Sequence, residues 1–125
     1  MSDRPHDIQE RTFVFACEVI RLCDASDDQR FTTRHVLREL LKAGTSVGAN
    51  MEEASAGQSK PDFIAKLSIS LKEARESRYW LRVFSTTRPR AAAGAAPLLQ
   101  ESGELVRILT TILKNARNNP YRGSA

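Results

Sequence analysis

The sequence predicts an all-α protein, folded as an antiparallel up-down-up-down four-helix bundle in a single domain. Apolar residues recur at helical spacing in four separate segments, and no segment shows the sustained two-residue alternation of a strand. The 125 residues suffice for one hydrophobic core and are too few for two ordinary domains. Amphipathic helices joined by short connections bury their apolar sides most economically as an antiparallel bundle. We expect one domain over residues 1–125, with helices at about 5–24, 34–57, 60–86 and 95–117 and a flexible tail at 118–125.

The first helix is expected to bury an apolar side made of Phe13, Ala16, Cys17, Ile20 and Cys23, widened by Phe15, Val19 and Leu22. Cys17 and Cys23 are the only cysteines of the chain. Because six residues of helix rise about 9 Å, a disulfide between them is disfavoured, and we expect two buried thiols. The polar stretch at 25–30 indicates a connection.

In the second helix, Thr32 or Thr33 is expected to cap the first turn. The buried stripe is expected to comprise Val36, Leu37, Leu40, Ala43, Val47, Met51 and Ala54. Gly44 and Gly48 lie inside this helix, each at a cost of about 1 kcal/mol relative to alanine. Their small size allows a neighbouring helix to come very close, which would offset that cost. We therefore assign Ala43, Gly44, Gly48, Asn50 and Glu52 to helix packing and oligomer contacts.

A membrane-embedded helix also uses glycines at this spacing, but Lys42, Glu52 and Glu53 lie too near them. The chain is 41% hydrophobic and 27% charged, and no apolar run approaches the roughly 20 residues that span a bilayer. We expect no membrane partner. The polar N-terminus lacks the apolar stretch of a secretory signal, which favours a cytoplasmic location.

The third helix is expected to start after a capping box formed by Ser59 and Asp62, with Pro61 tolerated in the first turn. Its stripe comprises Phe63, Leu67, Ser70, Leu71, Ala74, Arg78, Leu81 and Phe84. Pro89 ends it, since proline cannot continue the hydrogen-bond ladder. The fourth helix has an aliphatic stripe made of Leu98, Leu99, Leu105, Val106, Leu109, Ile112, Leu113 and Ala116.

Part of the chain resembles a known family. It consists of Arg38, of A-G-T-S-V-G-A-N-M-E-E-A at 43–54, and of D-F-I-A-K-L-S-I-S-L-K-E-A-R-E-S-R-Y-W-L at 62–81. These residues resemble the four-helix bundle proteins encoded by intervening sequences in bacterial 23S rRNA genes. Many members have a proline where this chain has Gly48 and a glycine near Ala54, so the chain looks like a divergent subgroup.

The resemblance implies a bundle that assembles into a homopentameric ring and has no known catalytic site. A protein of similar fold, the accessory variability protein of diversity-generating retroelements, is thought to hold nucleic acid and a reverse transcriptase on its basic surface. Transfer of that role to this chain rests on fold analogy alone.

Basic residues suggest contact with nucleic acid. The candidates are Lys66, Lys72, Arg75, Arg78 and Arg82 on the third helix, and Lys114 and Arg117 on the fourth. Cations neutralise phosphates with release of counterions, and an exposed Tyr79 or Trp80 ring could stack on an unpaired base. Two structural alternatives stay open. Lys72 and Glu76 are spaced as an ion pair on one helix, and the cations of the fourth helix complement its dipole.

No metal, cofactor or catalytic group is expected. The carboxylates Glu52, Glu53, Glu73 and Glu76 do not match the pattern of a di-iron bundle, because neither His6 nor His35 follows a glutamate at the Glu-x-x-His spacing. We expect Glu52 instead to accept hydrogen bonds from an arginine of a neighbouring helix or subunit, such as Arg75 or Arg78. The Asn50 amide is expected to be buried and bonded to backbone groups.

The sequence thus predicts a non-enzymatic, cytoplasmic homo-oligomer, with the pentamer favoured by the resemblance, whose basic surface binds RNA or DNA. The alternative is a structural or adaptor assembly that binds a protein partner and no nucleic acid. The salt dependence of oligonucleotide binding separates the two.

Overall fold

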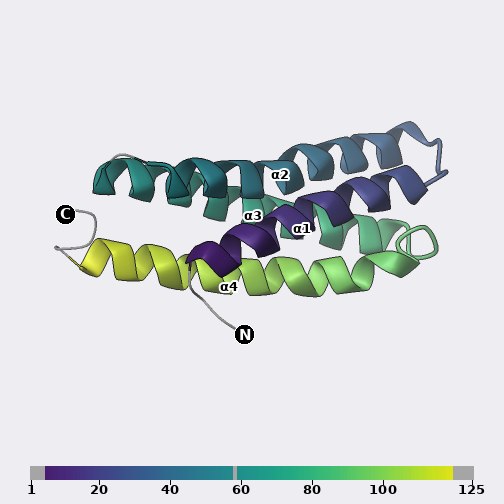
Figure 1. Ribbon diagram of the computed structural model, residues 1–125. Coiled ribbons are helices and arrows are strands. Elements are labelled where there is room, and N and C mark those ends of the chain that lie inside the picture. The colour runs from purple at the N-terminus through teal and green to yellow at the C-terminus, as the bar shows by residue number, and fades with distance from the viewer. Residues whose placement is uncertain (1–4, 58, 120–125) are drawn as a thin grey trace.

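Four helices run up, down, up and down along the chain in the computed structural model, which describes residues 5–57 and 59–119 (Figure 1). They are α1 (Pro5–Ala25), α2 (Phe31–Ser55), α3 (Lys60–Thr87) and α4 (Ala96–Asn118), and a short 3-10 turn, Ala93–Ala95, precedes α4. No strand occurs within those two ranges. The predicted fold class is confirmed. Of the predicted tail at 118–125, Asn118 belongs to α4, and residues 120–125 lie outside the described part of the chain.

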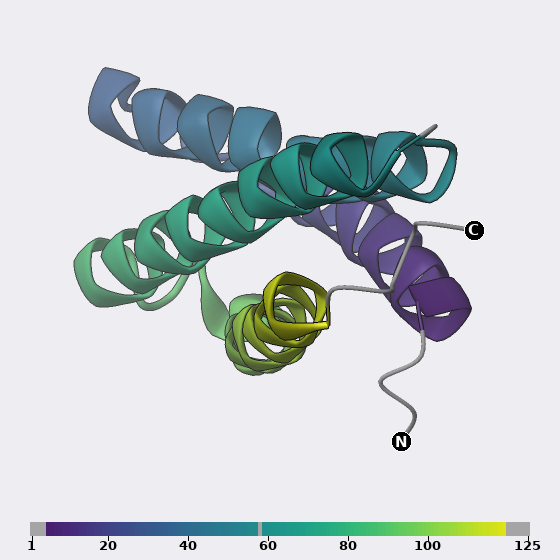
Figure 2. The same ribbon diagram turned by 90° about the vertical axis from the view of Figure 1, so that its left-hand side faces the viewer.

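The four helices differ in how extensively they contact one another. α2 and α3 form a long antiparallel pair, α1 packs on α2, and α4 packs on α3. α1 crosses the bundle obliquely (Figures 1 and 2), and its contact with α4 is much less extensive than its contact with α2. A bidentate ion pair joins these two helices, with Arg11 Nη2 2.6 Å from Glu101 Oε1 and Arg11 Nε 3.0 Å from Glu101 Oε2.

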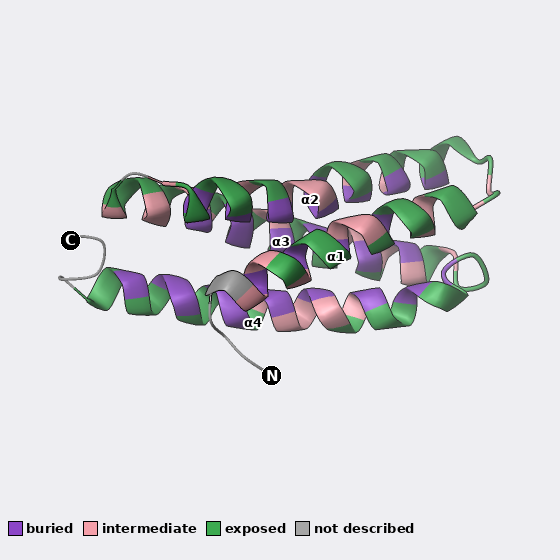
Figure 3. Ribbon diagram, viewed as in Figure 1, coloured by how far each residue is buried: buried purple, intermediate pink, exposed green. Residues whose placement is uncertain are grey.

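The core lies between the inward sides of all four helices (Figure 3). Its largest fully buried side chains include Phe15, Leu40, Leu67, Phe84 and Ile108, so each of the four helices contributes at least one. Burial of each such side chain stabilises the fold by roughly 1.5 to 3 kcal/mol. The predicted stripes of α2, α3 and α4 largely form this core, except that Arg78 is exposed and Ser77 is buried in its stead.

Gly44 and Gly48 face α1 at close range, as the sequence predicts. A Cβ on Gly44 would lie 2.8 Å from Val19 Cγ2, and a Cβ on Gly48 would lie 3.0 Å from the Thr12 carbonyl oxygen. Both distances are shorter than ordinary van der Waals contact. The absence of the two side chains therefore allows α1 and α2 to touch, and at Gly48 the contact is to backbone.

The expected buried side of α1 is wrong at Phe13 and Ile20 and right at Phe15 and Val19, which were expected to widen it. The side that faces the core consists of Ile8, Thr12, Phe15 and Val19, whereas Phe13 is 58% exposed and Ile20 is 42% exposed. Thr12 and Val19 are the residues that meet Gly48 and Gly44. Because consecutive residues differ by about 100° around a helix, turning Thr12 and Val19 toward α2 carries Phe13 and Ile20 outward.

Cys17 and Cys23 are free thiols, as predicted, but both are half-buried, whereas the sequence predicted that they would be fully buried. The Cys23 thiol lies 3.7 Å from the Leu37 carbonyl oxygen on α2, close enough for a weak hydrogen bond. Burial raises the pKa of the Cys23 thiol, and the neighbouring Asp24 carboxylate adds to the rise. This thiol is therefore more fully protonated near neutral pH than an exposed one.

One of the two predicted caps is formed. The Ser59 hydroxyl accepts a hydrogen bond from the Asp62 backbone N–H at 3.2 Å, which confirms the cap of α3. The prediction that Thr32 or Thr33 caps α2 is wrong, because α2 begins at Phe31 and Arg30 occupies the cap position. Both threonine hydroxyls instead accept from the Arg88 guanidinium at the end of α3, at 3.1 and 2.8 Å. Tertiary hydrogen bonds thus replace the local cap.

Candidate nucleic-acid interface

An open groove of about 390 Å³ runs between α3 and α4. Its lining residues are Ser68, Leu71, Arg75, Thr110, Leu113, Lys114, Arg117 and Asn118. Residues three and four apart share one side of a helix, and both helices present such a series to the groove. The groove therefore has three cationic side chains and no carboxylate among its lining residues.

The groove combines an apolar base with a charged rim. Leu71 and Leu113 are buried, while Arg75, Lys114 and Arg117 are exposed. Arg117 Nη2 lies 3.4 Å from the Ser68 hydroxyl, so this side chain reaches across from α4 to α3. Within the described ranges, Arg75 and Lys114 form neither an ion pair nor a side-chain hydrogen bond. Their charges are free to meet an anion from solvent.

Arg78 and Arg82 continue the row of cations along the same side of α3. They follow Arg75 at three and seven residues, and both are exposed. Arg78 Nε lies 3.7 Å from the position that a Cβ on Gly103 would take, so Arg78 leans over α4 where that helix has no side chain. On α4, by contrast, Arg107 faces a carboxylate of its own helix, with Arg107 Nη2 3.6 Å from Glu104 Oε1.

The other two predicted cations of α3 do not join this row. Lys66 is half-buried and lies nine residues before Arg75, which places it on the opposite side of the helix. Lys72 is exposed, and its ammonium lies 4.0 Å from Glu73 Oε2, whereas the predicted ion pair of Lys72 with Glu76 is not formed. The structure thus brings together five of the seven predicted basic residues.

Two carboxylates of α3, Glu73 and Glu76, influence each other. Burial raises the pKa of the Glu73 carboxyl above its ordinary value, and the negative charge of Glu76 raises it further. Lys72 and, more weakly, Lys42 oppose the rise. Within the described part of the chain, no group of three or more His, Cys, Asp or Glu residues lies close enough together to hold a metal ion.

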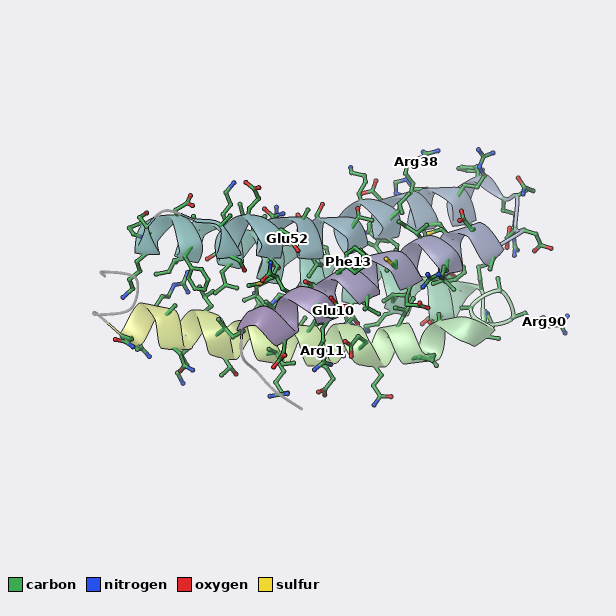
Figure 4. All side chains as sticks on the ribbon, in the orientation of Figure 1. Glu10, Arg11, Phe13, Arg38, Glu52 and Arg90 are labelled. Carbon is green, nitrogen blue, oxygen red and sulfur yellow. The ribbon has the colours of Figure 1, made fainter. Side chains whose placement is uncertain are left out.

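The residues assigned to packing have different surroundings. Ala43, Gly44 and Gly48 are buried between helices. Asn50 is half-buried, and its amide donates to the Ser46 carbonyl oxygen at 2.9 Å, so it is satisfied by backbone within its own helix. Glu52 is exposed on the outer side of α2, beside the stretch of α1 that carries Phe13 (Figure 4). Neither Arg75 nor Arg78 of the same chain bonds to it.

Sequence reasoning missed three polar contributors to the groove, Ser68, Thr110 and Asn118. Ser68 precedes Leu71 and Arg75 by three and seven residues, and Thr110 precedes Lys114 and Arg117 by four and seven. Helical spacing from the basic residues would have found them. Arg38, from the stretch that resembles a known family, is exposed on α2 and points away from the bundle (Figure 4).

Comparisons with known proteins agree with the geometry of the bundle. The family model described as 23S rRNA-intervening sequence protein matches residues 4–111. The chain is also similar to a crystal structure from Bacteroides thetaiotaomicron VPI-5482, described as a protein with unknown function from the S23 ribosomal protein family. The two share 31% identity with a TM-score of 0.78, and the match covers 88% of this chain and 97% of that one. Among curated proteins, nothing matches the chain. Within the described residues, no helix is long and apolar enough to cross a membrane.

Proposed function

The chain belongs to the 23S rRNA-intervening sequence protein family, and we propose that it binds RNA or DNA through the groove between α3 and α4. The supporting observation is that Arg75, Lys114 and Arg117 line one groove without any lining carboxylate. Arg78 and Arg82 extend the same row, and Arg78 leans toward α4. A row of unpaired cations along two helices fits the repeating negative charge of a phosphate backbone.

The proposed role is binding without catalysis. Cationic side chains displace condensed counterions from nucleic acid, and the entropy of their release supplies sequence-independent affinity. Each phosphate neutralised adds about 0.7 to the salt slope for a single strand and about 0.9 for a duplex. A cytoplasmic setting is part of this proposal, because the two free cysteines would stay reduced there.

Fluorescence anisotropy with a labelled generic oligonucleotide between ~50 and ~200 mM salt tests this function. We expect wild-type affinity to fall as salt rises. The double variant Lys114→Gln with Arg117→Gln should bind more weakly, and its salt slope should be smaller by roughly 1.4 for a single strand and roughly 1.8 for a duplex. Arg34→Gln with Arg38→Gln removes the same charge from exposed positions of α2 and is the matched control.

Two results would overturn the proposed groove. One is the absence of wild-type binding at ~50 mM salt, where phosphate contacts are strongest. The other is an equal loss of affinity in the groove variant and in the α2 control. An equal loss would mean that overall charge, and not the groove, attracts the oligonucleotide.

We also propose that the protein acts as a homo-oligomer, with five subunits as the number that the family resemblance implies. The outer side of α1 supports self-association, because Phe13 and Ile20 are exposed there and Leu41 is exposed on α2. Several copies of the groove on one particle would multiply weak phosphate contacts through effective concentration.

The alternative function is an adaptor that binds a protein partner and no nucleic acid. A groove of about 450 Å³ between α1 and α4 favours it, because the lining includes Val14, Phe15, Leu22, Pro97 and Leu98. Oligonucleotide binding that is absent at low salt, or insensitive to salt, would favour the adaptor.

A further inference from the structure

We propose that Tyr79 on α3 stacks on an unpaired base, so that the nucleic acid bound beside it is single-stranded. This inference rests on the proposed function of the α3–α4 groove and specifies the class of ligand. It adds a contact to a base where the groove itself offers contacts to phosphates.

Tyr79 is a large aromatic side chain on the polar side of α3. It is 55% exposed and contributes nothing to the hydrophobic core. Arg75 lies four residues before it and Arg82 three residues after it, so both lie one turn away on the same side of the helix. Among the residues that the structure describes, neither arginine is paired with a carboxylate. Glu76, three residues before Tyr79, is also exposed on this side, so the ring stands among two cations that are available to phosphates and one carboxylate.

A chain of rings holds Tyr79 in place. Its ring meets Trp80 edge-on, with centroids 5.0 Å apart and an interplanar angle of 76°. Trp80 packs against the core and meets the His35 ring of α2 edge-on, with centroids 5.8 Å apart. Contact with a partly buried neighbour restricts the motion of Tyr79. A ring that is already restrained loses little conformational entropy when a base stacks on it.

The geometry favours a single strand over a duplex. In a double helix, both faces of each base are covered by neighbouring base pairs. An aromatic side chain gains a stacking partner only where a base is unpaired and turned outward. Cations on both sides of the ring fit the phosphates that precede and follow such a base. Proteins that bind single strands combine cations that contact the phosphates with aromatic rings that stack on the bases. Tyr79, with Arg75 and Arg82 one turn away, offers both kinds of contact.

The test compares a single-stranded oligonucleotide of about 12 nucleotides with a blunt duplex of the same sequence, by anisotropy at one salt concentration. Tyr79→Ala should weaken single-strand binding by roughly 5- to 150-fold and leave duplex binding unchanged. Tyr79→Phe keeps the ring and should bind as the wild type does. Phe31→Ala removes an aromatic side chain that is 82% exposed at the start of α2, and it is the matched control.

The salt slope distinguishes stacking from phosphate contact. Tyr79→Ala should keep the wild-type slope, because no cation is lost, whereas the Lys114 and Arg117 double variant should lower it. Circular dichroism checks that Tyr79→Ala folds, which is expected because the position is exposed and alanine favours helix.

Unchanged single-strand affinity in Tyr79→Ala would overturn the stacking contact. If the Lys114 and Arg117 double variant still weakened binding, the groove function would stand without it. Equal wild-type affinity for the single strand and the duplex would also overturn this inference. Absence of binding to either oligonucleotide would overturn the groove function as well, so failure of the two proposals can be told apart.

Discussion

Gly44 and Gly48 allow α1 and α2 to meet at close range, and they do so by different contacts. The space above Gly44 is filled by the Val19 side chain, whereas the space above Gly48 is filled by the Thr12 carbonyl group. A side chain can be shortened by mutation, but a backbone carbonyl cannot. The two positions should therefore respond differently to the same change.

Gly44→Ala and Gly48→Ala should each destabilise the fold. Overpacking costs roughly 1 to 3 kcal/mol, and the higher helix propensity of alanine offsets about 1 kcal/mol of that cost. Val19→Ala removes the methyl groups nearest Gly44 and should reduce the cost of Gly44→Ala. Thr12→Ala leaves the carbonyl oxygen 3.0 Å from the added Cβ, so the cost of Gly48→Ala should persist. Urea unfolding of the two double-mutant cycles measures this. Equal rescue in both cycles would contradict the backbone contact at Gly48.

The ends of the helices are held by tertiary contacts. In the connection between α1 and α2, the Asp28 carboxylate accepts from the Arg30 backbone N–H at 3.0 Å and from the Arg30 guanidinium at 2.6 and 3.1 Å. Arg88, which follows α3, lies 3.5 Å from the same carboxylate and also bonds to both threonines at the start of α2. Asp28 and Arg88 thus join the α1–α2 connection to the end of α3.

This junction should make stability depend on pH. Hydrogen bonds from Arg30 hold the pKa of the Asp28 carboxyl well below its ordinary value, and Arg88 contributes to the shift. Because the folded pKa is lower than the unfolded pKa of about 3.9, the stabilisation is present above that pH and is lost as pH falls below it.

Asp28→Asn should therefore be less stable than the wild type at pH 7, and the difference should shrink in acid. Urea unfolding between pH 7 and pH 3 measures it. Asp27→Asn, at the neighbouring exposed residue, is the matched control. A gap between wild type and Asp28→Asn that stays constant over this range would contradict the role of the carboxylate.

The whole molecule pairs α2 with α3 at its centre and leaves one side of α1 uncovered. Phe13 and Ile20 are exposed on that side, and Leu41 is exposed on α2, although their residue types are typical of a core. A second copy that covered this surface would remove apolar area from water, which is the main source of affinity in most protein associations.

Self-association through α1 predicts that Phe13→Glu combined with Ile20→Glu lowers the mass of the particle in solution. The burial of two new charges in the interface would be costly, while the fold should stay helical because both positions are exposed. Light scattering with size-exclusion chromatography measures the mass, and Phe31→Glu is the control. A monomeric wild type, or a variant of unchanged mass, would contradict this interface.

Local patterns in the chain were enough to predict the class of fold, four helices to within about three residues at each end, the Ser59 cap and the close approach at Gly44 and Gly48. The helices and the cap depend on residues within a few turns of one another, so periodicity and capping chemistry report them directly, whereas the two glycines indicate a close approach without showing which helix makes it. The choice of buried side on α1 was not predictable in this way. Both Phe13 with Ile20 and Phe15 with Val19 form apolar rows, and only the contact with α2 selects between them.

The same limit applies to the candidate site. Spacing along α3 shows that Arg75, Arg78 and Arg82 share a side, but it cannot show that Lys114 and Arg117 lie across from them. That juxtaposition joins residues about 40 positions apart, and it depends on the register in which α3 and α4 pack. Helical periodicity is a property of one helix at a time, whereas a groove is a property of two helices in contact, so tertiary packing alone decides which cations meet.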